Sequence, residues 1–221
     1  MSDPSLLGVL GLTLQVAGIA TVMTAVPGIA LGYALARWSF PGKTILSSAV
    51  TLPLVLPPTA IGFLLLRLFA TDGPLGRQTL GFDLNILLTW KAAVIAGSVM
   101  SLPLVARTAR VTFEGIDPRL EQAARTLGFS PMAVFARVTL PMARSGLLAA
   151  LILGFTRAVG EFGATVTLAG NIPGRTQTLA SAIFSAQQRG DMARADWLMM
   201  VALILGLAAI WTSEALARGR Q

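Results

Sequence analysis

The stretch "LEQAARTLGFSPMAVFARVTLP" (residues 120–141) is a polar interruption between apolar runs that are long enough to cross a bilayer. Just before it, Asp117 is a good N-cap, and Pro118 suits the first position of a helix. Gly128 can supply the left-handed residue that ends a helix. These signals predict a short helix over about residues 118–127.

A second set of helix signals follows within the same stretch. Ser130 can cap a new helix with Pro131 as its first residue, which predicts a helix over about residues 131–138. Leu140-Pro141 is then expected to break the chain before the next apolar run, because proline lacks a backbone donor. The sequence thus predicts two short helices between two apolar runs.

Both short helices have an apolar side, although neither is long enough to be stable alone in water. In the first, four residues share one face at i, i+3, i+4 and i+7 spacing, namely Leu120, Ala123, Ala124 and Leu127. The two alanines keep this face shallow, which suits the close approach of another surface. The alternative is that the two helices merely lie on the lipid headgroups.

The composition of the whole chain indicates an integral membrane protein. Of its 221 residues, 54% are hydrophobic and 12% are charged, and the mean hydropathy is +0.73, whereas soluble domains carry about 25% charged residues. Cysteine and histidine are absent from the sequence, which excludes disulfides and thiolate catalysis and leaves no expected metal site. The net charge of +7 is attributed to membrane topology and not to nucleic-acid binding.

Five apolar runs are each close to the roughly 20 residues that a spanning helix needs. The predicted spans cover about residues 9–36, 44–69, 86–106, 145–168 and 197–216. The expected fold class is therefore all-α, with residues 1–221 forming a single transmembrane domain. Because no basic residue precedes the first run, we expect a retained span and not a cleaved signal peptide.

The distribution of Lys and Arg among the connections sets the expected orientation. Ten of these residues fall on one side, namely Arg37, Lys43, Arg107, Arg110, Arg119, Arg125, Arg137, Arg144, Arg218 and Arg220. The other side carries at most six, namely Arg67, Arg77, Lys91, Arg175, Arg189 and Arg194. This asymmetry predicts an external N-terminus, a cytoplasmic C-terminus and a cytoplasmic position for residues 117–141.

The stretch "EQAARTLG…VTLP" resembles the cytoplasmic signature of permease subunits in binding-protein-dependent ABC importers. The resemblance implies that residues 117–141 form coupling helices that dock into a separate ATPase subunit, which hydrolyses ATP with Mg²⁺. The implied coupling residues are Glu121, Gln122, Ala123, Ala124, Gly128, Leu140 and Pro141. The sequence departs from the family pattern at one point, since Gln122 occupies the usual acidic position and Glu121 precedes it.

Further stretches are similar to the molybdate-type permeases, which are close relatives of the sulfate permeases. These stretches are "LPLVLPPTAIGFLLL" (52–66), "GEFGAT" (160–165) and "GNIPGRTQTL" (170–179), and the resemblance covers most of residues 10–215. It implies the type I ABC importer permease fold, a homodimer of this chain, two copies of the ATPase and an external oxyanion-binding protein. The sequence has no Walker A phosphate loop, so we expect ATP to bind to the partner and no cofactor to bind to this chain.

Arg157 and Glu161 lie near the middle of the predicted fourth span, four residues apart and so on one helical face. Charges at that depth are costly unless they are paired or face a polar cavity. The two are interpreted as a structural ion pair, with gating or lining of the transport path, or direct contact of Arg157 with an oxyanion, as alternatives. Pro57 and Pro58 are further pathway candidates, because a broken helix is tolerated in a membrane only beside protein or water.

A short helix on the external side is expected to begin at Thr178 and to end near Gly190. Arg175 and Arg189 flank it and are candidates for an external mouth that attracts the substrate or the binding protein, with a solvated loop as the alternative. Selective recognition of a small dianion needs converging donors, and none is apparent in the predicted spans. Selectivity is therefore expected to reside in the binding protein.

The sequence as a whole predicts a permease subunit that moves molybdate across the bacterial cytoplasmic membrane by alternating access. A related oxyanion, such as sulfate, thiosulfate or tungstate, is the alternative substrate. A less favoured alternative is an ion-coupled carrier, in which Glu161 would be the coupling carboxylate. The lack of His, Cys and catalytic pairs argues against an enzyme.

Overall fold

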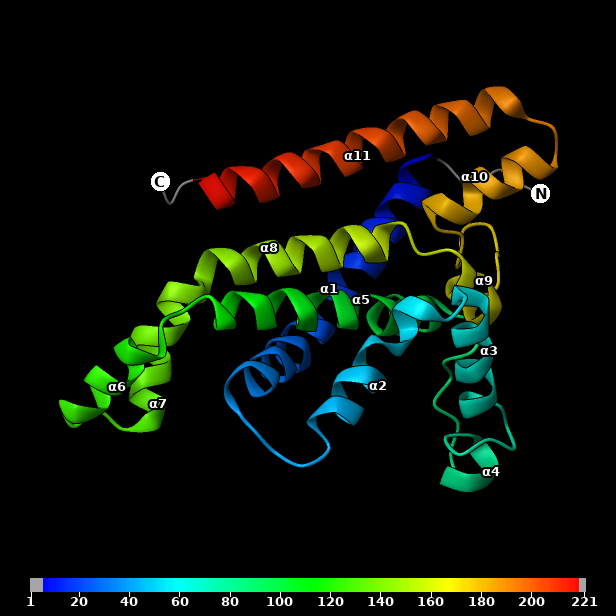
Figure 1. Ribbon diagram of the computed structural model, residues 1–221. Coiled ribbons are helices and arrows are strands. Elements are labelled where there is room, and N and C mark those ends of the chain that lie inside the picture. The colour runs from blue at the N-terminus through cyan, green and yellow to red at the C-terminus, as the bar shows by residue number, and fades with distance from the viewer. Residues whose placement is uncertain (1–5, 219–221) are drawn as a thin grey trace.

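Four long apolar helices dominate the computed structural model, which describes residues 6–218. They are α1 (Leu6–Arg37), α5 (Trp90–Glu114), α8 (Leu140–Val159) and α11 (Met192–Arg218). Figure 1 shows α5 and α8 running side by side, with α1 crossing them and α11 lying along α8. The described part of the chain consists of helices and connections without a strand. The predicted all-α class is therefore confirmed.

The second predicted span forms two helices with a sharp bend between them. The axes of α2 (Lys43–Val55) and α3 (Pro58–Phe69) are bent by 112°. The backbone is extended at Leu56 because a proline follows it, and Pro57 and Pro58 lack the donors that would continue the helix. When this broken pair is counted as one span, residues 6–218 hold up to five candidate spans by length and composition.

The predicted bounds of the fourth span are wrong. The sequence predicts one helix over residues 145–168, whereas α8 begins at Leu140 and ends at Val159. A short helix, α9 (Gly163–Ala169), follows after a break. Hydropathy averaged over a window does not detect this break because apolar residues flank Glu161 on both sides. The other spans lie within about two turns of their predicted ends. Of the residues that set the expected orientation, Arg220 lies outside the described part of the chain.

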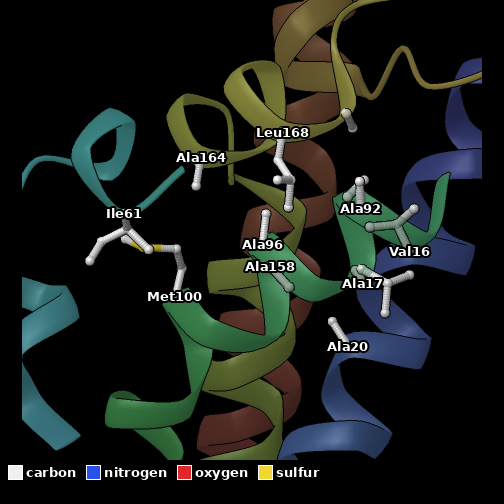
Figure 2. Packing of buried hydrophobic residues seen from close by; sticks show 13 residues of the cluster. Val16, Ala17, Ala20, Ile61, Ala92, Ala96, Met100, Ala158, Ala164 and Leu168 are labelled. Atoms are coloured by element: carbon white, nitrogen blue, oxygen red, sulfur yellow. The ribbon is translucent and has the colours of Figure 1, made fainter. Parts of the chain in front are cut away.

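Small residues hold α1, α5 and α8 close together. The main apolar cluster, part of which Figure 2 shows, contains six nearly inaccessible alanines from these helices, Ala17, Ala20, Ala92, Ala93, Ala96 and Ala158. At Gly32 of α1, a Cβ atom would lie 2.7 Å from Cβ of Ala109 and 2.8 Å from the carbonyl oxygen of Ala106 on α5. Helices in lipid associate through such packing of small residues. Gly32 is therefore required for the close contact between α1 and α5.

The elbow, defined as residues 117–141, connects α5 to α8 and projects from one end of the helix bundle (Figure 1). It contains α6 (Pro118–Thr126), α7 (Pro131–Val134) and a π-helical turn, η1 (Phe135–Thr139). The expected break at Leu140-Pro141 is wrong, because the helix runs from α7 through η1 into α8. Pro141 has no N–H to donate, and the widened turn accommodates it. The N–H of Leu140 accordingly donates to the carbonyl of Phe135, five residues back.

The opposite end of the bundle is built from shorter helices. These are α3 with the four-residue α4 (Arg77–Leu80), α9, and α10 (Leu179–Gln188), which Figure 1 shows away from the elbow. Helix α10 begins directly after Thr178, as predicted. Gly190, with φ of +76°, follows its end. The chain then turns into α11, which runs back toward the end that carries the elbow.

Candidate functional site

The short helices of the elbow have the caps that the sequence predicts. Asp117 Oδ1 accepts the N–H of Arg119 at 2.9 Å, and Ser130 Oγ accepts the N–H of Ala133 at 3.3 Å. Gly128 has φ of +87°, a left-handed conformation that favours glycine. These caps give the elbow a defined shape although its helices are short.

Glu121 points into the protein and not toward the outer surface of the elbow. Its side chain is 11% exposed. Its Oε1 atom accepts hydrogen bonds from Arg37 Nη2 at 3.0 Å and from Thr139 Oγ1 at 2.9 Å. Arg37 Nη2 also donates to the carbonyl oxygen of Ile116. One carboxylate therefore joins α6, η1 and the C-terminal end of α1.

An aromatic cluster connects the same elements. The ring of Tyr33 on α1 packs edge to face against Phe113 of α5 and Phe135 of η1, with centroid distances of 5.2 and 5.1 Å. Trp38, just after α1, makes a further edge contact with Tyr33 at 6.2 Å. Such aromatic pairs add to the stability gained by burial. The elbow is thus fixed to α1 and α5 by apolar contacts as well as by the ion pair.

The elbow carries exposed apolar side chains, of which Met132 lines a hollow between the elbow and α1. Leu127 is 78% exposed and Met132 is 75% exposed. Of the expected coupling residues, Glu121 and Ala124 are buried. The others are exposed, namely Gln122, Ala123, Gly128, Leu140 and Pro141. Exposed apolar groups often mark an interaction site, so the exposed residues of the elbow are the candidate docking surface.

Arg157 and Glu161 form an ion pair, but they do not lie on one continuous helix. Arg157 Nη1 is 2.6 Å from Glu161 Oε2. Glu161 lies beyond the end of α8 and is buried, and its Oε1 accepts the N–H of Ala164 in the first turn of α9 at 2.8 Å. The placement of both charges in mid-helix is therefore wrong, because Glu161 leaves α8 to cap α9.

The two interrupted helices meet at their breaks. Pro58 is the first residue of α3 and Gly163 is the first residue of α9. A Cβ atom at Gly163 would lie 2.8 Å from Cβ of Pro58, and α3 packs along α9. Pro57 and Pro58 are exposed beside this contact. The structure thus brings together the pathway candidates from the second and fourth predicted spans.

Arg175 and Arg189 are exposed and lie beyond α9 and α10, respectively. A polar network that the sequence did not reveal joins the connection between α9 and α10 to α10 itself. Gln177 Nε2 donates to Asn171 Oδ1 at 3.1 Å, and Asn171 Nδ2 donates to Ser185 Oγ at 2.6 Å. The many amide and hydroxyl side chains within residues 170–179 could have indicated this network. This network gives the connection between α9 and α10, which carries Arg175, a fixed shape, and Arg189 follows the end of α10.

These features define a helical integral membrane protein with interrupted spans and a hydrogen-bonded elbow at one end. Residues 28–218 match the family described as the binding-protein-dependent transport system inner membrane component, and the chain belongs to this family. It is 40% identical over 220 residues to the molybdenum transport system permease protein ModB of Escherichia coli, covering 99% of this chain and 96% of that protein.

Other relatives extend this comparison. ModB of Haemophilus influenzae is 41% identical over 215 residues, covering 96% of this chain and 93% of that protein. The sulfate transport system permease protein CysT of Salmonella typhimurium is 33% identical over 216 residues, covering 98% of this chain and 78% of that protein. The resemblance to the molybdate-type permeases is therefore confirmed, with the sulfate permeases as further relatives.

Two solved structures share the fold at low sequence identity. A chain of the MetNI methionine ABC transporter in an inward-facing conformation has a TM-score of 0.73 and 20% identity, covering 99% of both chains. A chain of a bacterial alginate ABC transporter, in complex with its alginate-bound periplasmic protein, has a TM-score of 0.72 and 16% identity, covering 95% of this chain and 76% of that one. The predicted type I ABC importer permease fold is confirmed.

Proposed function

We propose that this chain is the transmembrane subunit of an ATP-driven importer that carries molybdate across the bacterial cytoplasmic membrane. The observation that carries the proposal is the identity of 40–41% to molybdenum permeases over nearly the whole chain. Sulfate is the second candidate substrate, because sulfate permeases match at 33–34% identity. Molybdate, tungstate and sulfate are all tetrahedral dianions, so one path suits their common chemistry.

The elbow is the part of the chain that we assign to the ATPase subunit. In this assignment the exposed Leu127 and Met132 enter a cleft of the partner, together with Gln122 and Ala123. Glu121 then transmits the displacement of the elbow to α1 through Arg37, because the two side chains are 3.0 Å apart and largely buried. The partner binds ATP and Mg²⁺, since this sequence lacks a phosphate-binding loop.

The complete importer is proposed to contain two copies of this chain, two ATPase subunits and one external oxyanion-binding protein. A single chain offers four or five spans, which is few for enclosing a path, and a symmetric pair solves this problem. The charge asymmetry of the connections supports an external N-terminus and a cytoplasmic elbow. Arg175 and Arg189 then face the binding protein and attract its anion.

Transport is proposed to occur by alternating access at the junction of the two interrupted helices. Interrupted helices at membrane depth line cavities or protein contacts, and Pro58 and Gly163 bring two such interruptions together. The Arg157–Glu161 ion pair lies at the same junction. We assign it to the lining of the path, where Arg157 is partly exposed and Glu161 limits the net positive charge.

Reconstitution of the purified subunits in liposomes tests this function. With ATP and Mg²⁺ on the ATPase side, the full complex is expected to take up labelled molybdate only when the oxyanion-binding protein is present, and tungstate should compete. Equal uptake of sulfate would contradict the assignment to molybdate. Uptake by this chain alone, driven by a proton or sodium gradient, would establish an ion-coupled carrier instead.

A further inference from the structure

A cavity of about 370 Å³ lies between α2 and α5, outside the sites assigned above. Its polar lining consists of Ser47 and Thr51 on α2 and of Arg107 and Arg110 on α5. Arg110 is four residues from Glu114, the last residue of α5, so the cavity lies toward the end of the bundle that carries the elbow. Helices α2 and α5, which form its walls, are labelled in Figure 1.

The cavity carries an excess of positive charge. Arg107 and Arg110 are three residues apart on one side of α5, where like charges repel. Arg110 Nε donates to Glu114 Oε1 at 2.7 Å, which leaves its terminal amino groups available. Arg107 is exposed and makes no hydrogen bond or ion pair within residues 6–218. None of the described residues that line the cavity is acidic, so an anion placed here would relieve the repulsion.

The α2 wall adds hydroxyl groups opposite the two guanidinium groups. Thr51 Oγ1 donates to the carbonyl oxygen of Ser47 at 2.9 Å. The Ser47 hydroxyl has no hydrogen-bond partner in the described part of the chain and is free to donate to an anion. A guanidinium group presents paired N–H donors that match two oxygens of a tetrahedral anion. The cavity therefore offers converging donors from two helices.

We propose that this cavity binds the transported ion, a tetrahedral oxyanion. The cavity lies toward the end of the bundle that carries the elbow, so the ion reaches it after passing the junction of the interrupted helices. This inference rests on the proposed function and adds a binding site to it. Helix α2 contributes no buried residue, so the wall that carries Ser47 is loosely held and can move away from Arg107. A weak site that opens in this way suits a transporter, because the ion must also leave.

Equilibrium binding to the purified full-length chain in a maltoside detergent, which has no phosphate, tests the site. Labelled molybdate is expected to bind to the wild type, and Arg107→Gln should weaken binding at least about tenfold. Arg77→Gln, which removes an exposed arginine of α4 outside the cavity and outside the elbow, is the matched control and should bind as the wild type does. Wild-type affinity in Arg107→Gln would overturn the proposal, as would a lack of molybdate binding to the wild type.

Two further variants keep the test decisive if Arg107→Gln folds poorly. Ser47→Ala removes one donor without changing charge and should weaken binding severalfold. Arg107→Lys keeps the charge but not the paired donors, and its affinity should lie between those of the wild type and Arg107→Gln. Size-exclusion profiles report the folding of each variant. Wild-type affinity in both of these variants would overturn the assignment of the donors.

A lipid headgroup has the same tetrahedral oxyanion chemistry, and a second arm separates this source from the free ion. The wild type is placed in bilayer discs of phosphatidylglycerol, and the bound lipid is measured by native mass spectrometry. We expect molybdate to bind equally well with and without this lipid. If phosphatidylglycerol abolished molybdate binding and its own retention required Arg107, the cavity would be a lipid site and the proposal would be overturned.

Uptake by the reconstituted importer distinguishes failure of this inference from failure of the proposed function. If the wild-type complex imports molybdate while Arg107→Gln leaves binding and uptake unchanged, only the inference fails. If the wild-type complex imports no oxyanion, the proposed function itself fails. Loss of both binding and uptake in Arg107→Gln, with both retained in Arg77→Gln, is the expected result.

Discussion

Glu121 connects three elements of this permease through a single carboxylate. It accepts hydrogen bonds from Arg37 at the end of α1 and from Thr139 in η1. Arg37 Nε is buried without a hydrogen-bond partner in the part of the chain that the structure describes. The guanidinium group therefore depends on Glu121 and the carbonyl of Ile116 for compensation. Removing either charge leaves the other one largely buried and unpaired.

Glu121→Gln is expected to destabilise the protein by about 3 kcal/mol, because the charge of Arg37 loses its counterion in a largely buried position. Arg37→Gln should have a similar effect, and the double variant should lose clearly less than the sum of the two. Thermal unfolding of the purified chain measures these changes, with Arg119→Gln as the exposed control. Strictly additive losses would show that the two side chains do not interact.

Glu161 has two contacts that a pair of substitutions can separate. Glu161→Gln removes the charge opposite Arg157 but keeps an oxygen that can accept the N–H of Ala164, whereas Glu161→Ala removes both. ATP-driven uptake is expected to fall in both variants, and Glu161→Ala should be about 1 kcal/mol less stable than Glu161→Gln through loss of the cap. Uptake and thermal unfolding are measured in parallel. Wild-type uptake in Glu161→Gln would exclude the charge from the transport path.

The caps of the elbow could be predicted from sequence, whereas the contacts of Glu121 could not. Asp117, Gly128 and Ser130 act on their own helix ends, so a local pattern is sufficient to identify them. The partners of Glu121 are 84 and 18 residues away in sequence, at Arg37 and Thr139. Local spacing carries no information about contacts over such separations, so the burial of Glu121 could not be foreseen.

The second and fourth predicted spans are interrupted, and the two interruptions have different causes. Pro57 and Pro58 remove backbone donors, so the sequence shows a break between α2 and α3, although not its angle of 112°. The break after Val159 has no proline. It depends on Glu161, which turns away from α8 to cap α9. Apolar residues flank Glu161 on both sides, and for that reason hydropathy predicted an unbroken span.

The contact between α1 and α5 depends on the absence of a side chain at Gly32. Gly32→Ala would place Cβ 2.7 Å from Cβ of Ala109 and 2.8 Å from the backbone nitrogen of Arg110. Because a backbone atom cannot rotate away, the helices must separate, and we expect a loss of about 2 kcal/mol.

Gly18→Ala on the same helix is the matched control, since a Cβ atom there meets nothing within 4 Å. It should be neutral or slightly stabilising, because alanine favours the helix more than glycine does. The midpoints of thermal unfolding compare the two variants. Equal midpoints would mean that α1 and α5 do not approach each other so closely.

In the whole molecule, a core of small apolar residues lies between two polar ends. The elbow, its ion pair and the cavity beside Arg107 lie toward one end, and the polar network near Asn171 lies toward the other. The counts of Lys and Arg predict only which of these ends faces the cytoplasm, and that orientation stays a prediction. The sequence does not predict which helices are neighbours, because the small residues spaced every three or four positions from Thr13 to Gly32 mark a packing face of α1 but not its partner.

The orientation of the chain in the membrane is a prediction that single thiols can test, because the sequence contains no cysteine. Thr126→Cys is exposed at the end of α6, and Arg175→Cys is exposed beyond α9. In intact spheroplasts, a membrane-impermeant maleimide is expected to label Arg175→Cys, whereas Thr126→Cys should react only after permeabilisation. The reverse pattern would place the elbow outside and remove the proposed contact with an ATPase.

The close packing of α1 against α5 also bears on hydrogen–deuterium exchange. Amides near Gly32 and Ala106, where the two backbones almost touch, should exchange among the slowest in the protein, while those of α2, which has no buried residue, should exchange early. A displacement that reaches Arg37 would accordingly carry α1 and α5 along as one stiff unit. The movement that opens and closes the transport path would then occur mainly in α2.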